Sequence, residues 1–144
     1  MAQSNDTSVA RQELAFSRLP AAAAGVVRPL SMDEVAVAPD GYWGRWQHVN
    51  ATSIVDHCST WMHSEGWVDN FVAAAAGPLP QARRGREFTD SDVYKLIEAM
   101  SWENGRQPSD ELERSIQNLI DVVANAQEPD GYINTNFGRE GQVG

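Results

Sequence analysis

Two amphipathic segments joined by a very short connection constrain the fold of this chain more than any other feature. Apolar residues recur at helical spacing in the segment after Thr89, and the same spacing returns after Ser109. Little more than Gly105-Arg-Gln-Pro108 separates the two segments, and helices joined by so short a link pack antiparallel as an αα-hairpin. There is almost no strand pattern, so the sequence predicts an all-α protein. The apolar positions are Val93, Leu96, Ile97 and Met100 in the first segment, and Leu112, Ile116, Leu119, Ile120 and Val123 in the second.

The ends of these two helices carry recognisable signals. Thr89 with Asp92 three residues later resembles a capping box, and Ser109 or Asp110 opens the second helix. Pro129 and Gly131 stop it. Within the first helix, Lys95 is expected to pair with Glu98.

A longer helix is predicted from Tyr42 to Glu65, with Gly66 as the glycine that ends it. Its larger apolar residues recur at helical spacing; they are Trp43, Trp46, Ile54, Cys58 and Trp61. This spacing favours core packing of the three tryptophans.

The segments on either side of this helix are shorter. Residues 1–25 are expected to form a disordered tail. Val35 and Val37 mark a short extended segment that ends at the turn Pro39-Asp40-Gly41. Asp69 is expected to cap a short alanine-rich helix that Gly77-Pro78 terminates, with Asn70 bracing the loop and Phe71 in the core. The basic loop after it, PLPQARRGRE, is expected to be exposed.

Composition excludes several classes of function. The 20 acidic and 11 basic residues give a net charge of −9, so the basic face that nucleic acid requires is absent. The single cysteine, Cys58, forms no internal disulfide. No segment approaches the ~20 apolar residues of a membrane span, and the first residues lack a signal peptide. A cytoplasmic location is therefore expected.

Three blocks of sequence resemble one family of enzymes. They are FTDSDVYKLIE at Phe88–Glu98, AQEPDGYINTNF at Ala126–Phe137 and WVDNFVAAAAG at Trp67–Gly77. In this order and spacing they resemble the N-terminal part of bacterial β-L-arabinofuranosidases of glycoside hydrolase family 127. The resemblance implies the N-terminal portion of an (α/α)6 toroid of helical hairpins, formed here by residues 26–144.

The family's enzymes are several times longer than 144 residues. The chain is therefore interpreted as an incomplete catalytic domain, inactive alone, of a retaining hydrolase acting on non-reducing-end β-L-arabinofuranosides. The resemblance implies a cysteine nucleophile, a zinc ion held by cysteines and a glutamate, and a separate acid glutamate, all beyond the matched region. Zinc is thus expected in the longer protein, with no catalytic residue or cofactor site in this chain.

The resemblance also suggests substrate-binding residues. Toroids of this kind point the N-termini of inner helices at the sugar pocket, which favours Asp90 and Asp92, while the carboxylate of a helix N-terminus also has a simple capping role. The turn after the second helix returns the chain toward the same face of the toroid, where the sugar pocket lies. Aromatic, hydroxyl and amide side chains in this turn are therefore suggested as contacts to a sugar. A polar residue near the tryptophans is suggested as well. The six candidates are Asp90, Asp92, Tyr132, Asn134, Thr135 and His57.

A metal site within this chain is rejected on spacing. His48, His57 and His63 with Cys58 form neither a CxxC nor an HExxH pattern, and His57 and His63 lie on different faces of a helix. Cys58 is not assigned as the nucleophile, because it precedes the DSDVYK block whereas the family's nucleophile follows it.

Two alternatives to this interpretation remain open. In the first, the chain is a non-catalytic helical interaction module; in the second, it belongs to another (α/α)6 carbohydrate hydrolase or lyase. The expected partner of the longer protein is a carbohydrate. Two hairpins leave apolar faces open, so marginal stability or self-association as a homo-oligomer is also expected.

Overall fold

The computed structural model describes residue 30 and residues 34–77 and 83–137. The chain divides into two units, Met1–Ala36 and Val37–Gly144, and every helix named below belongs to the second. The tail expected over residues 1–25 lies outside the described residues. The helical elements are α1 (Tyr42–Val49), η3 (Asn50–Ile54), α2 (Val55–Ser64), α3 (Trp67–Ala76), α4 (Thr89–Arg106) and α5 (Asp110–Asn125). No strand occurs among the described residues, which confirms the all-α class.

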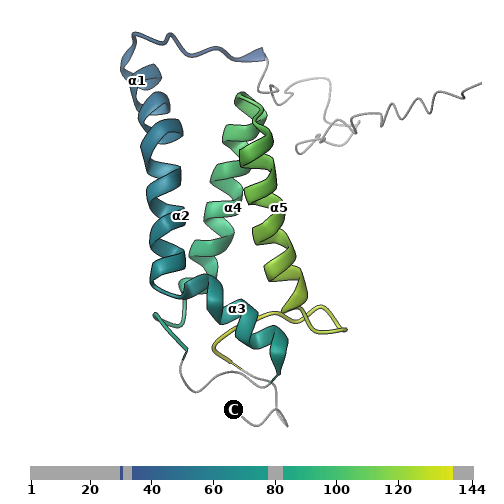
Figure 1. Ribbon diagram of the computed structural model, residues 1–144. Coiled ribbons are helices and arrows are strands. Elements are labelled where there is room, and N and C mark those ends of the chain that lie inside the picture. The colour runs from purple at the N-terminus through teal and green to yellow at the C-terminus, as the bar shows by residue number, and fades with distance from the viewer. Residues whose placement is uncertain (1–29, 31–33, 78–82, 138–144) are drawn as a thin grey trace, which may run out of the picture. The chain divides into compact units, whose positions relative to one another are not determined.

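The first three elements run on as one long helix (Figure 1). It begins after the predicted turn, where the Gly41 amide donates to the Ala38 carbonyl at 2.9 Å. Gly44 is buried beside that turn, and a Cβ there would lie 2.1 Å from the Ala38 oxygen, so only glycine fits. The helix ends where predicted, because Gly66 takes the left-handed conformation at φ 74°.

The tryptophans of this helix do not pack in the core, which corrects the sequence prediction. Trp43, Trp46 and Trp61 remain 71%, 51% and 51% exposed, whereas Val55 and Met62 face the core. Helical spacing shows that residues share a face, but the positions of neighbouring helices decide which face is buried.

Helix α3 starts directly after Gly66, and Asp69 lies inside its first turn without capping it, contrary to the prediction. The predictions for the next two residues are confirmed. Phe71 is fully buried, and Asn70 braces the following loop through hydrogen bonds to the backbone of Arg84.

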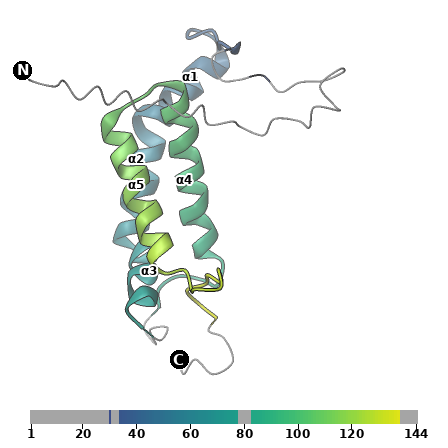
Figure 2. The same ribbon diagram turned by 90° about the vertical axis from the view of Figure 1, so that its right-hand side faces the viewer.

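Helices α4 and α5 form the predicted antiparallel hairpin and lie side by side in Figures 1 and 2. Ser109 caps α5, since its Oγ accepts from the Leu112 amide at 3.3 Å. The capping box expected at α4 is absent, because Thr89 lies inside the helix and donates to the Arg86 carbonyl. Lys95 pairs with Asp92 at 3.0 Å, so the pair expected with Glu98 is wrong.

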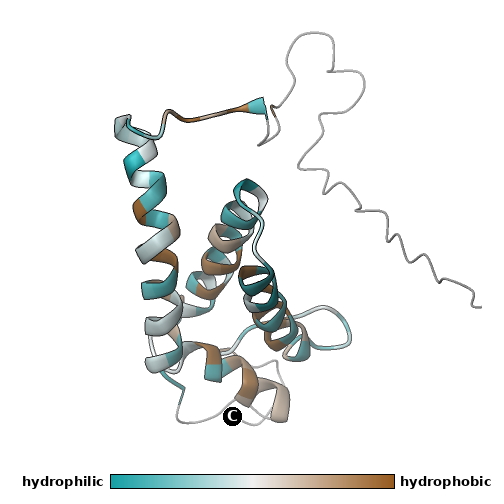
Figure 3. Cartoon of the chain, turned by 45° about the horizontal axis from the view of Figure 1, so that its top comes forward, coloured by the Kyte–Doolittle hydropathy of each residue, from teal (hydrophilic) through white to brown (hydrophobic). Residues whose placement is uncertain are grey.

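Helix α3 lies at the end of the hairpin where α4 begins and α5 ends (Figure 1). It is largely apolar, whereas α5 carries both apolar and hydrophilic residues (Figure 3). The core forms where α2, α3, α4 and α5 meet. Its buried apolar residues are Val55, Met62, Val68, Phe71, Val93, Leu96, Met100 and Leu119.

Candidate functional site

A buried ion pair holds the start of α4. The guanidinium of Arg83 donates to Oδ1 of Asp90 at 3.0 Å, and the two side chains are only 8% and 9% exposed. The same guanidinium donates to the hydroxyl of Thr89 at 2.9 Å and to the carbonyl of Arg86 at 2.8 Å. A buried charge pair is tolerated when its remaining hydrogen-bonding groups also find partners, as they do here.

The same carboxylate binds the segment that follows α5. The backbone amide of Thr135 donates to Oδ2 of Asp90 at 2.7 Å, and its hydroxyl donates to Oδ1 at 2.5 Å. Arg83 also donates to that hydroxyl at 2.9 Å. The Asp90 network, formed by Arg83, Thr89, Asp90 and Thr135, therefore joins parts of the chain that are 45 and 52 residues apart.

An apolar groove of about 470 Å³ is lined by residues of η3, α2, the start of α3 and α4. His57 and Asp92 both line it, so two of the predicted substrate-binding residues come together. The indole of Trp61 stacks with the His57 ring at a centroid distance of 6.3 Å. The groove is lined by Asn50, Ile54, Val55, His57, Cys58, Trp61, Met62, Trp67, Asp92, Lys95, Leu96 and Ala99.

The two remaining candidates lie in the turn after α5. The hydroxyl of Tyr132 donates to the Phe137 carbonyl at 2.8 Å. The side-chain oxygen of Asn134 accepts from the amides of Asn136 and Phe137, each at 2.7 Å. Neither residue is among those that line the groove. The six candidates thus fall into three places: the groove, the Asp90 network and this turn.

Comparison with known proteins identifies the scaffold. Residues 34–142 match the family model described as the β-L-arabinofuranosidase GH127 catalytic domain. The chain belongs to the GH127 family. It is 38% identical over 66 residues to a non-reducing end β-L-arabinofuranosidase of Bifidobacterium longum subsp. longum, covering 46% of this chain and 10% of that protein. It also resembles a solved GH127 β-arabinofuranosidase with a TM-score of 0.68 and 33% identity, covering 74% of this chain and 17% of the other.

All three sequence blocks resembling GH127 enzymes are tied together in the structure. Asp90 of the DSDVYK block binds Thr135 of the DGYINT block, while Asn70 of the VDNF block binds both the amide and the carbonyl of Arg84. Arg84 directly follows Arg83, whose side chain donates hydrogen bonds to Asp90 and Thr135. Residues of the loop between α3 and α4 therefore contact all three blocks. This GH127 region is therefore organised around that loop.

Sequence reasoning missed Arg83, because the basic loop was expected to be exposed. Its side chain is instead 8% exposed. A signal was present: an acidic residue buried at a helix start requires a cationic or hydrogen-bonding partner, and the loop just before Asp90 supplies arginines. Trp67 and Lys95 were likewise not predicted beside His57 and Asp92 in the groove.

Tyr94 connects the network to the core. Its ring lies 5.8 Å from that of Phe71, between centroids. Burial, with a smaller contribution from the Asp90 carboxylate, raises the pKa of the Tyr94 hydroxyl above its ordinary value, so this group stays neutral at physiological pH.

The described residues do not fit a zinc site. Among them, no group of three or more His, Cys, Asp or Glu side chains is placed to hold a metal ion. We therefore assign no zinc-dependent step to residues of this part of the chain. Within the same residues, no helix combines the length and apolar character that a membrane span needs.

Proposed function

We propose that this chain is part of a retaining glycoside hydrolase that removes β-L-arabinofuranose from the non-reducing end of a carbohydrate. The observation that supports this proposal most is the family match over residues 34–142. The name of the Bifidobacterium relative, a non-reducing end β-L-arabinofuranosidase, supports the choice of sugar and bond. The matched segment belongs to an (α/α)6 toroid in this proposal, with the α4–α5 hairpin as one of its units.

The residues of this chain bind and position substrate in our proposal and carry out no bond cleavage. His57 and Asp92, together with Asn50 and Lys95, supply polar groups in a largely apolar groove with aromatic walls, a composition suited to a sugar ring and its hydroxyls. Tyr132 and Asn134 extend the substrate contacts from the turn after α5. The catalytic cysteine, the zinc ligands and the acid glutamate belong to other parts of the enzyme.

Asp90 and Thr135 take part in substrate binding by holding the surrounding segments in place. The Asp90 carboxylate is 9% exposed and accepts hydrogen bonds from Arg83 and Thr135 on both of its oxygens. A group so fully engaged contributes orientation, because direct contact with a sugar would require it to give up these partners.

Hydrolysis of a chromogenic β-L-arabinofuranoside by the product of the gene that encodes these residues tests the proposal. We expect release of L-arabinose that requires zinc and a reduced thiol and is lost after thiol alkylation. Turnover of an unsaturated uronyl substrate instead would assign the chain to a different toroid enzyme. Inactivity of the folded gene product on both substrates would contradict the proposal and favour a helical interaction module.

A further inference from the structure

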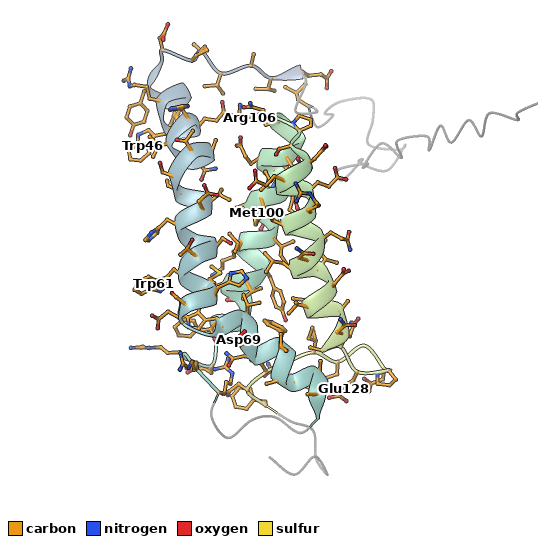
Figure 4. All side chains as sticks on the ribbon, in the orientation of Figure 1. Trp46, Trp61, Asp69, Met100, Arg106 and Glu128 are labelled. Atoms are coloured by element: carbon orange, nitrogen blue, oxygen red, sulfur yellow. The ribbon has the colours of Figure 1, made fainter. Side chains whose placement is uncertain are left out.

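Part of the groove wall is the indole of Trp67, the first residue of α3. In the chain, Trp67 lies between Trp61 and Asp69, at the corner from α2 to α3 that these two labels mark in Figure 4. It lines the groove together with His57 and Asp92, and it also packs against the hydrophobic core. The position of this indole therefore affects how much of the groove is open to a bound molecule.

Gly85, in the loop between α3 and α4, lies against this indole. A Cβ at position 85 would be 2.8 Å from Nε1 and 3.1 Å from Cδ1 of Trp67, and 2.6 Å from the methyl group of Thr89. Non-bonded carbon atoms normally stay about 3.5–4.0 Å apart. Gly85 also has a φ of 80°, a conformation that favours glycine. The close packing of the loop against the indole therefore depends on the absence of a side chain at position 85.

The loop around Gly85 is anchored by two buried side chains. The guanidinium of Arg83, which is 8% exposed, donates to the Gly85 carbonyl at 3.3 Å and to the Arg86 carbonyl at 2.8 Å. The side chain of Asn70, a residue that is 4% exposed, binds the carbonyl and the amide of Arg84 at 2.8 and 3.0 Å. The backbone on both sides of Gly85 is thus fixed, so it has little freedom to move away from the indole.

A side chain at position 85 would displace the indole rather than Thr89. Thr89 is only 2% exposed, and its hydroxyl is hydrogen-bonded to the Arg83 guanidinium and to the Arg86 carbonyl, so its methyl group has little freedom. The indole of Trp67 is only partly buried and borders the open volume of the groove. Because closely packed groups leave no room for one another, movement of the indole into that volume is the easier adjustment.

We propose that Gly85 is a positioning residue for the groove: because it lacks a side chain, the Trp67 indole lies against the anchored loop and leaves the groove open to the sugar. This inference rests on the proposed function, since it concerns the groove to which we assign the arabinofuranoside. Gly85 itself touches no substrate and acts through Trp67. The Asp90 network, to which Arg83 belongs, is linked to the groove through this loop.

Steady-state kinetics of the gene product on a chromogenic β-L-arabinofuranoside test the proposal first. Gly85→Ala should raise KM about 2- to 10-fold, the range that one aromatic contact contributes, and leave kcat near the wild-type value. A purely structural role would instead lower the active fraction, and hence the apparent kcat, without changing KM. Gly77→Ala is the matched control, because its φ of 152° also favours glycine but an added Cβ there meets no atom within 4 Å. This control should keep both constants near the wild-type values.

Trp67→Phe tests whether the effect of Gly85 passes through the indole. Phenylalanine lacks the Nε1–Cδ1 edge that lies against position 85, so Gly85→Ala should change KM clearly less in this background than in the wild type. Fluorine NMR of the gene product labelled with 5-fluorotryptophan gives a readout that does not depend on activity. The Trp67 resonance, identified by its loss in Trp67→Phe, should shift in Gly85→Ala and stay in place in Gly77→Ala.

If Gly85→Ala does not fold, the same measurements are made with Thr89→Ser added, since serine keeps the hydroxyl and lacks the methyl group 2.6 Å from the added Cβ. An unchanged KM in the folded variant would overturn the inference, as would a rise in KM that Trp67→Phe leaves undiminished. Either result, obtained while the wild-type enzyme hydrolyses the arabinofuranoside, contradicts this inference alone. Absence of hydrolysis by the wild-type enzyme contradicts the proposed function, and the role of Gly85 then fails with it.

Discussion

Asp90 and Asp92 are two residues apart at the start of α4, yet their surroundings differ. Asp90 is buried against Arg83, whereas Asp92 pairs with Lys95, a side chain that is 69% exposed. Asp90→Asn should destabilise the protein by about 3–5 kcal/mol, because it leaves a buried guanidinium without its counter-ion. Asp92→Asn should cost about 0–1 kcal/mol, as for other exposed pairs. Urea unfolding followed by circular dichroism measures both values.

The control for this comparison is Arg83→Met, which removes the other member of the buried pair. In the double variant with Asp90→Asn, the loss of stability should be clearly smaller than the sum of the two single losses, because neither charge is then left unpaired. Equal small losses for Asp90→Asn and Asp92→Asn would show that the Asp90 network contributes little to stability.

At the scale of an element, the start of α5 depends on one side chain. The Ser109 Oγ accepts from the Leu112 amide, and no other side-chain cap of a helix start is found in the described part of the chain. Ser109→Ala should therefore reduce stability by about 1 kcal/mol, while Ser109→Asp should keep it near the wild-type value. Thermal unfolding of the two variants side by side measures the difference. Similar losses for both would mean that the hairpin connection, rather than the cap, limits the helix.

At the scale of the whole molecule, the core is small and its centre is Phe71. This side chain is fully buried, among only eight buried apolar residues in the described structure, while the adjacent Val72 is 53% exposed. Phe71→Ala should cost about 3–5 kcal/mol, a large part of the ~5–15 kcal/mol that stabilises a typical domain. Val72→Ala should change stability by less than about 0.5 kcal/mol. A cooperative melt of Phe71→Ala near the wild-type temperature would place the centre of the core elsewhere.

The helices, the αα-hairpin and the family could all be predicted from the amino-acid sequence. The apolar spacing, the glycine at position 66 and the Ser109 cap act within a few residues, so they can be read locally, and the three family blocks are likewise contiguous in sequence. Asp92, which lies in one of these blocks, and His57, which lies near the tryptophans outside them, could both be proposed as substrate contacts from the family resemblance. Whether they contact a sugar stays a prediction.

Which helix faces are buried and which side chains meet depends instead on how the helices pack together. The tryptophans of α1 and α2 were expected inside and are outside, because the helices that pack against this one take up its other side. Arg83 was expected to be exposed, yet it lies buried against Thr135, 52 residues away. Helical periodicity is a property of neighbouring residues, whereas burial and long-range hydrogen bonds depend on where distant segments of the chain come to lie.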